Sequence, residues 1–92
     1  MMRLQWTSRA LSDLARLHDF LAPRNPAAAA KAVQALVRAP EVLHQHPRLG
    51  EKVEGFADRE VRRILALSYE LRYEVVEDTI YILRLWHTRE RR

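Results

Sequence analysis

The chain has 92 residues, 16 Lys and Arg against 12 Asp and Glu, a formal net charge of +4 and no cysteine. This length fits one domain with a thin core, and the lack of cysteine excludes disulfides and thiolate metal sites. No apolar run approaches the roughly 20 residues that span a bilayer and no secretory signal is visible, so we expect a single cytoplasmic domain over residues 1–92, with no membrane association.

A short strand followed by a helix is predicted at the N-terminus. Leu4 and Trp6 alternate with polar residues over residues 1–6, a period of two that is typical of a strand. Over residues 9–22 apolar residues recur at helical spacing, and Asp13 is expected on the outer face of this helix. The apolar positions of the helix are Ala10, Leu11, Leu14, Leu17 and Leu21.

A second helix is predicted over residues 27–46. Asn25 is a good N-cap, and Pro26 at the first helical position loses only an N–H that has no helical partner there. Pro40 lies inside this helix, so we expect either a kink near residues 36–37 or a break into two shorter helices. The short link between the two helices predicts an antiparallel hairpin.

Three strand-like segments fill the last third of the chain, at residues 59–65, 69–76 and 79–87. In the middle segment aromatic and aliphatic residues alternate with charged residues, so one of its faces is expected to join the core. A tight turn at Glu77 joins the second and third segments. The order β-α-α-β-β-β predicts an α+β fold in which a helical hairpin packs on a mainly antiparallel sheet.

Arginine alternates with apolar residues inside these strands, and every basic residue except Lys31 and Lys52 is an arginine. Arginine makes forked contacts with carboxylates and phosphates and stacks on aromatic rings, so the bias fits nucleic acid or an acidic protein as partner. GC-rich codon usage would give the same bias without any function. Arg62 and Arg63 lie on opposite faces of their strand, so we expect one to face a groove and the other to pair with a strand glutamate.

Several short motifs follow one another along nearly the whole chain. They are Trp6, Ala10 with Asp13-Leu14, Asn25-Pro26 with Ala28 and Ala29, Leu43, Pro47, Leu49-Gly50, the run REVRRI at residues 59–64, Tyr69 to Tyr73, Ile80 to Leu85, and His87 with Arg89. In order and spacing this set resembles the RelE/ParE superfamily of bacterial toxins. The resemblance implies a type II toxin that needs no cofactor. It also implies a cognate antitoxin, ParD-like or similar, whose acidic disordered tail folds as a helix and strand onto the helical hairpin and the sheet edge.

Two activities occur among chains of this superfamily. ParE-like members poison DNA gyrase and block replication, whereas RelE-like members cut mRNA on the ribosome. Cutting RNA requires a group that activates the 2′-hydroxyl, cations that stabilise the developing phosphorane charge and an acid that protonates the leaving oxygen. Under this ribonuclease alternative the catalytic candidates are Arg63, Arg72, His87 and Arg89.

Two departures from the RelE-like pattern favour the ParE-like branch. RelE-like chains carry an arginine directly after the strand tyrosine, and here Glu70 follows Tyr69, where its charge would repel a phosphate. A slip in the alignment would move Arg72 into that position. RelE-like chains also carry a tyrosine near the C-terminus, whereas no tyrosine follows Arg89 in this chain. We therefore predict an inhibitor of DNA gyrase that has no catalytic residue of its own.

In the ParE-like interpretation, the basic strands form a surface that binds protein. Its partners are gyrase and the antitoxin, and nucleic acid is contacted only through the antitoxin complex. Aromatic residues in strands mostly fill the core, but partial exposure of Trp86 would mark a contact patch. The candidate partner-binding residues are Arg59, Arg62, Arg63, Arg72, Trp86, His87 and Arg89.

Two further alternatives have less support in the sequence. A helix-turn-helix DNA-binding protein would expose polar, base-reading side chains on its second helix, which here is rich in alanine and carries an apolar stripe. An inactive toxin-derived domain is the other alternative. His44 and His46 face apart near a helix end, so no metal site is expected.

Overall fold

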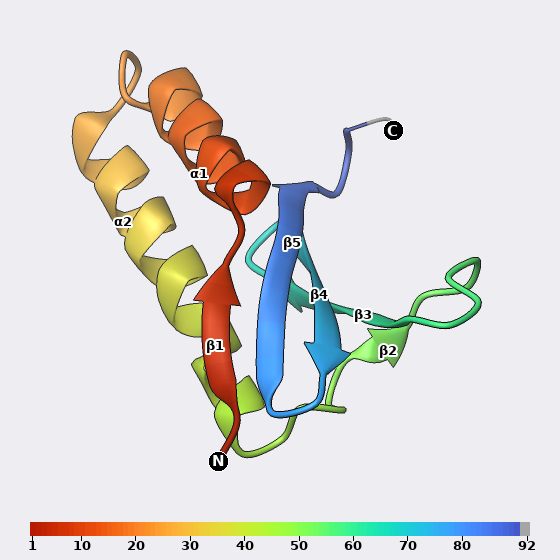
Figure 1. The fold of residues 1–92 in the computed structure, drawn as a ribbon. Helices are drawn as coiled ribbons and strands as arrows, with labels where there is room; N and C mark the ends of the chain where they lie inside the picture. Colours follow the sequence, from red (N-terminus) through yellow and green to blue (C-terminus); the bar gives the residue numbers. More distant parts are fainter. Residues whose placement is uncertain (91–92) are drawn as a thin grey trace.

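The computed structural model describes residues 1–90, in which a hairpin of two α-helices packs against a five-stranded sheet (Figure 1). The strand order is β1-β5-β4-β3-β2, and β1 pairs in parallel with β5 while the other neighbours are antiparallel. The predicted α+β fold is confirmed. The elements are β1 (Arg3–Trp6), α1 (Ser8–Leu21), α2 (Pro26–Arg38), the 3-10 helix η1 (Ala39–His44), β2 (Glu51–Lys52), β3 (Glu60–Ala66), β4 (Tyr69–Val76) and β5 (Thr79–His87).

Side-chain caps fix where both helices begin. The Asn25 side chain accepts a hydrogen bond from the Ala28 N–H at 3.0 Å, as its sequence position predicts. The Thr7 hydroxyl oxygen accepts from the Ala10 N–H at 3.1 Å and donates to the Ile82 carbonyl at 2.9 Å. This hydroxyl therefore starts α1 and at the same time ties α1 to the edge of β5.

The predicted second helix breaks, because it contains a proline. The α-helical part ends at Arg38 and η1 continues the chain to His44, so the predicted break into two shorter helices is confirmed, and the helical segment ends two residues before the expected position. Pro40 has no N–H, and its ring clashes with the carbonyl four residues earlier in a continuous α-helix. The tighter 3-10 turn avoids this clash and keeps Pro40 and Leu43 buried.

The core lies between the helical hairpin and one face of the sheet. The helices contribute the predicted positions, with the exception of Leu11, which is 53% exposed and does not widen the apolar stripe of α1. The sheet contributes the alternate residues of β4 and their neighbours on β5. The buried apolar residues of the two core clusters are Ala10, Leu14, Leu17, Leu36, Leu43, Leu71, Tyr73, Val75, Ile80, Ile82 and Leu85.

Tyr73 ties the loop after η1 to the sheet. Its ring is fully buried, and its hydroxyl donates to the Pro47 carbonyl at 2.8 Å and accepts from the Gly50 N–H at 2.9 Å. Burial raises the pKa of the Tyr73 hydroxyl above its ordinary value. These two hydrogen bonds hold Gly50 close to β3. The next two residues form the edge strand β2, which was not predicted from the sequence.

Replacing Tyr73 by phenylalanine is expected to lower the free energy of unfolding by about 1–2 kcal/mol. The variant keeps the ring in the core but leaves the Gly50 N–H and the Pro47 carbonyl without their partner. Urea denaturation at neutral pH measures the loss. Tyr81→Phe is the matched control, because the Tyr81 hydroxyl makes no comparable bond among the described residues, and its stability should stay within about 0.5 kcal/mol of the parent chain. Equal losses would contradict this role of Tyr73.

A β-bulge in β5 decides which side chains reach each face of the sheet. Arg72 on β4 pairs with Arg84, whereas the next residue, Tyr73, pairs with Ile82, so Leu83 has no partner on β4. The extra residue shifts the alternation of side chains by one position. As a result Leu85 joins the core, while Arg84 lies on the face away from the helices.

Candidate partner-binding surface

The sheet face away from the helices carries a row of arginines. Arg63 on β3, Arg72 on β4 and Arg84 on β5 lie opposite one another in the strand register. Beside this row, Glu70 on β4 lies opposite Trp86 on β5. The bulge in β5 brings Arg84 and Trp86 to this face, and the resulting basic strand face consists of these five residues.

The charges of the basic strand face are largely balanced within the chain. Glu70 is only 4% exposed, and its carboxylate accepts from Arg72 Nη2 at 3.0 Å and from Arg63 Nη1 at 3.4 Å. Arg63 also donates to the Glu51 carboxylate on β2 at 2.6 Å. A phosphate that approached these two arginines would have to compete with carboxylates already in contact with them.

Trp86 lies beneath the arginines. The Arg72 guanidinium carbon is 4.8 Å from the centre of the Trp86 ring, and that of Arg84 is 5.9 Å away. Trp86 is 4% exposed, so it is a packing residue, as is usual for aromatic residues in strands, and the partial exposure that would have marked a contact patch is not found. The indole is covered because the two flanking arginines lie across it, so any partner meets guanidinium groups rather than the ring.

Asp13 anchors the end of this row from α1. The prediction that Asp13 lies on the outer face of its helix is wrong: the residue is 4% exposed and accepts from Arg84 Nε at 2.8 Å and from the Leu85 N–H at 2.9 Å. Since β1 ends at Trp6, Asp13 takes over the hydrogen bonding of the β5 edge beyond that strand. Burial by itself raises the pKa of Asp13, but hydrogen bonds from Arg84 and Leu85 and the charges of Arg84 and Arg16 outweigh it and hold the pKa below its ordinary value.

Sequence reasoning missed the roles of Asp13 and Arg84, although one signal was present. Asp13 lies three residues after Ala10 and four before Leu17, and both of these residues are buried. A carboxylate on the apolar stripe of a helix must have a partner in the folded chain. The identity of that partner could not be read from the sequence, because the bulge determines that Arg84 faces Asp13.

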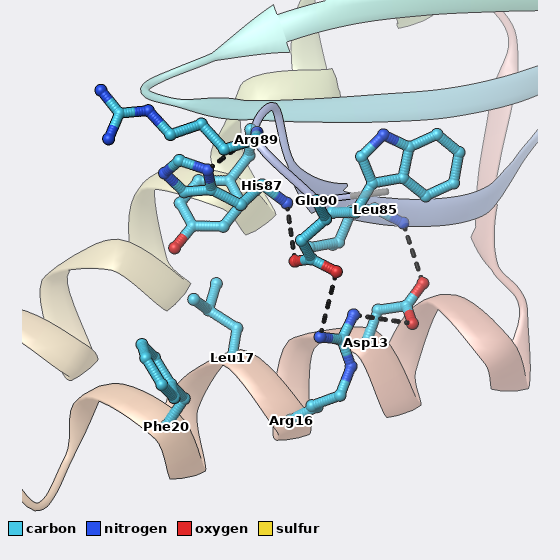
Figure 2. Close-up of a pocket in the computed structure, with 10 residues that line it drawn as sticks. Asp13, Arg16, Leu17, Phe20, Leu85, His87, Arg89 and Glu90 are labelled. Carbon is cyan, nitrogen blue, oxygen red and sulfur yellow. Dashed lines mark hydrogen bonds and ion pairs between the residues drawn. The ribbon is translucent and has the colours of Figure 1, made fainter. Parts of the chain in front are cut away.

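A terminal pocket of about 560 Å³ lies between α1 and the end of β5 (Figure 2). Its apolar lining includes Leu17 and Phe20. The Glu90 carboxylate accepts from Arg16 on α1 at 3.4 Å and from the His87 N–H at 3.0 Å, so the C-terminal turn is held against the helix. The Arg89 N–H donates to His87 Nδ1 at 3.1 Å, which leaves the neutral ring with its proton on Nε2.

The four ribonuclease candidates do not converge. Arg63 and Arg72 contact Glu70 on the face away from the helices. His87 follows Trp86 on β5 and therefore points to the opposite face, where its ring packs edge-on against Tyr69 and lines the terminal pocket. Arg89 lines the same pocket as His87. The set is thus divided into two pairs on opposite faces of the sheet.

The other two candidate partner-binding residues lie apart from both sites. Arg59 makes a forked contact with Glu74 at 3.0 and 2.9 Å and is half exposed. Arg62 donates to Glu60 at 2.9 Å and to the Gly50 carbonyl at 2.8 Å. Arg62 thus pairs with a strand glutamate, and Arg63 lines a groove beside β3, as expected for the two residues, although Arg63 is itself paired with carboxylates.

The part of the chain that the structure describes holds no group of three or more His, Cys, Asp or Glu residues placed to bind a metal ion. Over the same residues, no helix has the length and apolar character needed to cross a membrane. Among its described histidines, His44 contacts the Met2 carbonyl through Nδ1 at 2.6 Å and so serves to fix the N-terminus.

Comparisons with known proteins agree with this architecture. Toxin RelE2 and Toxin RelE3 of Caulobacter vibrioides are 30% and 34% identical to the chain, over 95% and 91% of its length and 96% and 91% of theirs. A solved chain of the chromosomal ParDE TA system from P. aeruginosa has a TM-score of 0.80 at 29% identity, over 95% of this chain and 96% of that one. The archaeal RelE–RelB complex from Pyrococcus horikoshii OT3 shares the fold, with a TM-score of 0.66 at 19% identity over 98% of both chains. The family model described as ParE toxin of type II toxin–antitoxin system, parDE, matches residues 4–92. The chain therefore belongs to the ParE toxin family of type II toxin–antitoxin systems, within the RelE/ParE superfamily.

Proposed function

We propose that this toxin inhibits DNA gyrase, that it acts by binding and not by catalysis, and that a cognate antitoxin neutralises it in the cytoplasm. The observation that carries the proposal is the division of Arg63, Arg72, His87 and Arg89 between opposite faces of the sheet. General acid–base cleavage of RNA needs the proton-transferring group and the cations around one phosphate. Two pairs separated by the sheet do not form such a site.

The local charge supports the same proposal. Stabilising a phosphorane requires cations aimed at the position of the phosphate. Arg63 and Arg72 instead point at Glu70, which is buried between them. A basic strand face with internally paired arginines is suited to a protein surface, where carboxylates of the partner can exchange with those of the chain.

The antitoxin is proposed from the relatives of known structure. The P. aeruginosa chain comes from a ParDE system, and the Pyrococcus horikoshii chain comes from a RelE–RelB complex. A third similar chain comes from the toxin–antitoxin complex RelBE2 of Mycobacterium tuberculosis, with a TM-score of 0.59. A partner of this kind also fits the net charge of +4, because an acidic antitoxin tail would be attracted to this chain.

Ribosome-dependent cleavage of mRNA is the second candidate function. The observation in its favour is that the two Caulobacter relatives carry the name RelE. It would require the chain to bring His87 and Arg89 to the same phosphate as Arg63 or Arg72. This arrangement does not exist in the described fold, so we rank the activity second.

Expression of the toxin in a bacterial host is expected to stop growth and to relax a reporter plasmid while cellular mRNA stays intact. Gyrase introduces negative supercoils, so its inhibition changes plasmid topology directly. Chloroquine gels measure the topology, and primer extension measures mRNA cleavage in the same culture. Co-expression of the proposed cognate antitoxin is the control and should restore both growth and supercoiling. Codon-spaced mRNA cuts with unchanged plasmid topology would refute the gyrase proposal.

A further inference from the structure

Two of the most exposed apolar side chains of the protein lie in one hairpin. Among the large apolar residues within residues 1–90, Leu65 is 68% and Leu67 66% exposed, and only Met1 at the N-terminus is more exposed. Phe20 follows at 65%, but the guanidinium carbon of Arg24 lies 5.4 Å from the centre of its ring. Leucines that remain in solvent contribute little to folding, and two of them together form a patch that a partner can cover.

Leu67 also has a backbone conformation that disfavours it. Ala66 at the end of β3 pairs with Tyr69 at the start of β4, so Leu67 and Ser68 alone form the turn between these strands. Leu67 has a φ of +56°, and a tight hairpin turn prefers glycine at such a position, because a Cβ atom crowds the backbone there. For a side chain as bulky as leucine this conformation is an outlier. The fold is therefore less stable with this leucine than with glycine, although the side chain is not buried.

The other tight hairpin of the sheet has the same kind of turn with a polar residue. Glu77 has a φ of +53° and is the first residue of the turn between β4 and β5, where Val76 pairs with Thr79. Its carboxylate can be solvated by water, as is usual for an exposed turn. Since both turns have a strained backbone, Leu67 differs from Glu77 in presenting an apolar side chain to solvent.

Neighbouring structure holds the tip of the β3–β4 hairpin in place. The Thr88 N–H, just after the end of β5, donates to the Ser68 carbonyl at 2.9 Å. At the base of the turn the rings of Tyr69 and His87 pack edge-on, with 5.2 Å between their centres. A strained residue persists only where its surroundings fix its conformation. Leu67 is therefore presented in a fixed position, which lowers the conformational entropy that is lost when a partner binds.

The two leucines extend the basic strand face. Leu65 follows Arg63 by two residues on β3, so its side chain lies on the same face of the sheet, opposite Glu70 on β4. Leu67 lies beyond it in the turn, and we call these two leucines the leucine tip. One partner surface can therefore contact the leucine tip and the neighbouring guanidinium groups at the same time.

The charges around the leucine tip favour a protein with carboxylates as its partner. Arg63 has 43% of its side chain exposed. Arg89 follows Thr88 and makes no ion pair among the described residues, and Figure 2 shows its side chain extending away from the Glu90 carboxylate. A second copy of the chain would bring like charges together at this end of the sheet. Nucleic acid presents mainly phosphates and sugars, which offer a leucine side chain no apolar recess.

We infer that the leucine tip is a contact by which the toxin recognises DNA gyrase. Leu65 and Leu67 enter an apolar recess of gyrase, and carboxylates at the rim of that recess meet Arg63 and Arg89. This inference rests on the proposed function, which supplies gyrase as the partner. It adds which end of the basic strand face makes the contact and which chemistry the gyrase surface has. Leu67 then strengthens binding while it weakens the fold.

Leu67→Gly tests this inference, because it should preserve the fold and impair the function. Glycine accommodates the positive φ, so the variant is expected to melt at no lower temperature than the parent chain. Without the leucine side chain, the toxin concentration that halves gyrase supercoiling is expected to rise about tenfold or more. Calorimetry gives the melting temperature, and supercoiling of relaxed plasmid by purified gyrase gives the inhibition. Inhibition by Leu67→Gly as strong as that of the parent chain would overturn the leucine tip and leave the proposed function standing.

Two further variants separate the side chain from the backbone. Glu77→Gly is the matched control, because it relieves the same strain in the other turn and should leave inhibition within about twofold of the parent chain. Leu67→Met keeps an apolar side chain on the strained backbone and should stay within about threefold. If Glu77→Gly lost as much inhibition as Leu67→Gly, the effect would belong to turn flexibility and the apolar contact would be refuted. A tenfold loss with Leu67→Met would count against an apolar recess in the same way.

Binding measurements identify the partner. Titration of the toxin into gyrase without DNA is expected to give a complex that Leu67→Gly weakens about tenfold. A toxin that bound plasmid DNA but not gyrase, with the DNA binding weakened by Leu67→Gly, would overturn a protein as the partner. If the parent chain neither bound nor inhibited gyrase, the proposed function and the partner inferred from it would both be refuted.

Discussion

Replacing Gly50 by alanine is expected to destabilise the fold by about 3 kcal/mol or more. A Cβ atom at this position would lie 2.5 Å from the Arg63 carbonyl oxygen and 2.7 Å from the Tyr73 hydroxyl oxygen. The first atom belongs to the backbone of β3, and the second is held between Pro47 and Gly50, so neither can yield at small cost. A loss of this size is a large fraction of the 5–15 kcal/mol that stabilises a typical domain. Urea denaturation at neutral pH measures it.

Gly55→Ala is the matched control for Gly50→Ala. Gly55 has a φ of +95° and no other atom within 4 Å of a Cβ built on it, so alanine there meets backbone strain but no clash. Its expected cost is about 1–2 kcal/mol. Comparison of the two variants therefore separates the stability cost of a steric clash from the cost of an unusual backbone conformation. A loss at Gly50 no larger than that at Gly55 would contradict the close packing of the loop on β3.

Replacing Asp13 by alanine is expected to lower the free energy of unfolding at pH 7 by about 2 kcal/mol. The buried carboxylate serves the Leu85 N–H and Arg84, and both would lose their partner. The cost stays below that of a fully buried ion pair, because Arg84 is 37% exposed and keeps part of its hydration. Thermal or urea denaturation of folded protein gives the value. A loss under about 0.5 kcal/mol would show that the edge of β5 does not depend on Asp13.

The contribution of Asp13 to the free energy of unfolding is also expected to depend on pH. Because its pKa is lowered in the folded state, the ionised carboxylate stabilises the fold above the ordinary aspartate value of about 3.9. As the pH falls through the lowered pKa, this stabilisation is lost. The difference in unfolding free energy between the parent chain and Asp13→Asn should therefore shrink below about pH 4. A difference that is constant from pH 7 to pH 3 would contradict the role of the ionised group.

Much of the fold could be predicted from the sequence, because simple periods determine which side chains are buried. The second helix was expected to carry an apolar stripe, and the apolar residues Ala29, Leu36 and Leu43 of that predicted helix are buried. The alternation in β4 likewise directs Leu71 and Tyr73 into the core. These patterns hold because burial of apolar surface is the main driving force, and each depends only on local geometry.

The features that were missed depend on contacts between distant parts of the chain. The bulge at Leu83 cannot be recognised by alternation, since it inserts one residue into an otherwise regular strand. Simple alternation would place Arg84 and Trp86 with Ile82 in the core. The strand β2 is equally invisible, because its two residues pair with β3 only after Tyr73 has fixed the preceding loop.

The candidate site was predicted in composition but not in arrangement. The sequence correctly marks the last three strands as basic, and it identifies Glu70 as an anion among cations. It does not show that Glu70 is buried between Arg63 and Arg72, or that His87 faces the other side of the sheet. The pairing of the arginines arises from strand register, which no single segment of the sequence specifies.

The most direct test of a gyrase-inhibiting, non-catalytic toxin uses purified components. The toxin is incubated with DNA gyrase, ATP and relaxed plasmid, and separately with programmed ribosomes and mRNA. We expect supercoiling to stop and linear DNA, released from stalled gyrase–DNA complexes, to accumulate with toxin concentration, while the mRNA stays uncut. Unimpaired supercoiling at toxin concentrations that cleave the ribosome-bound mRNA would contradict this account.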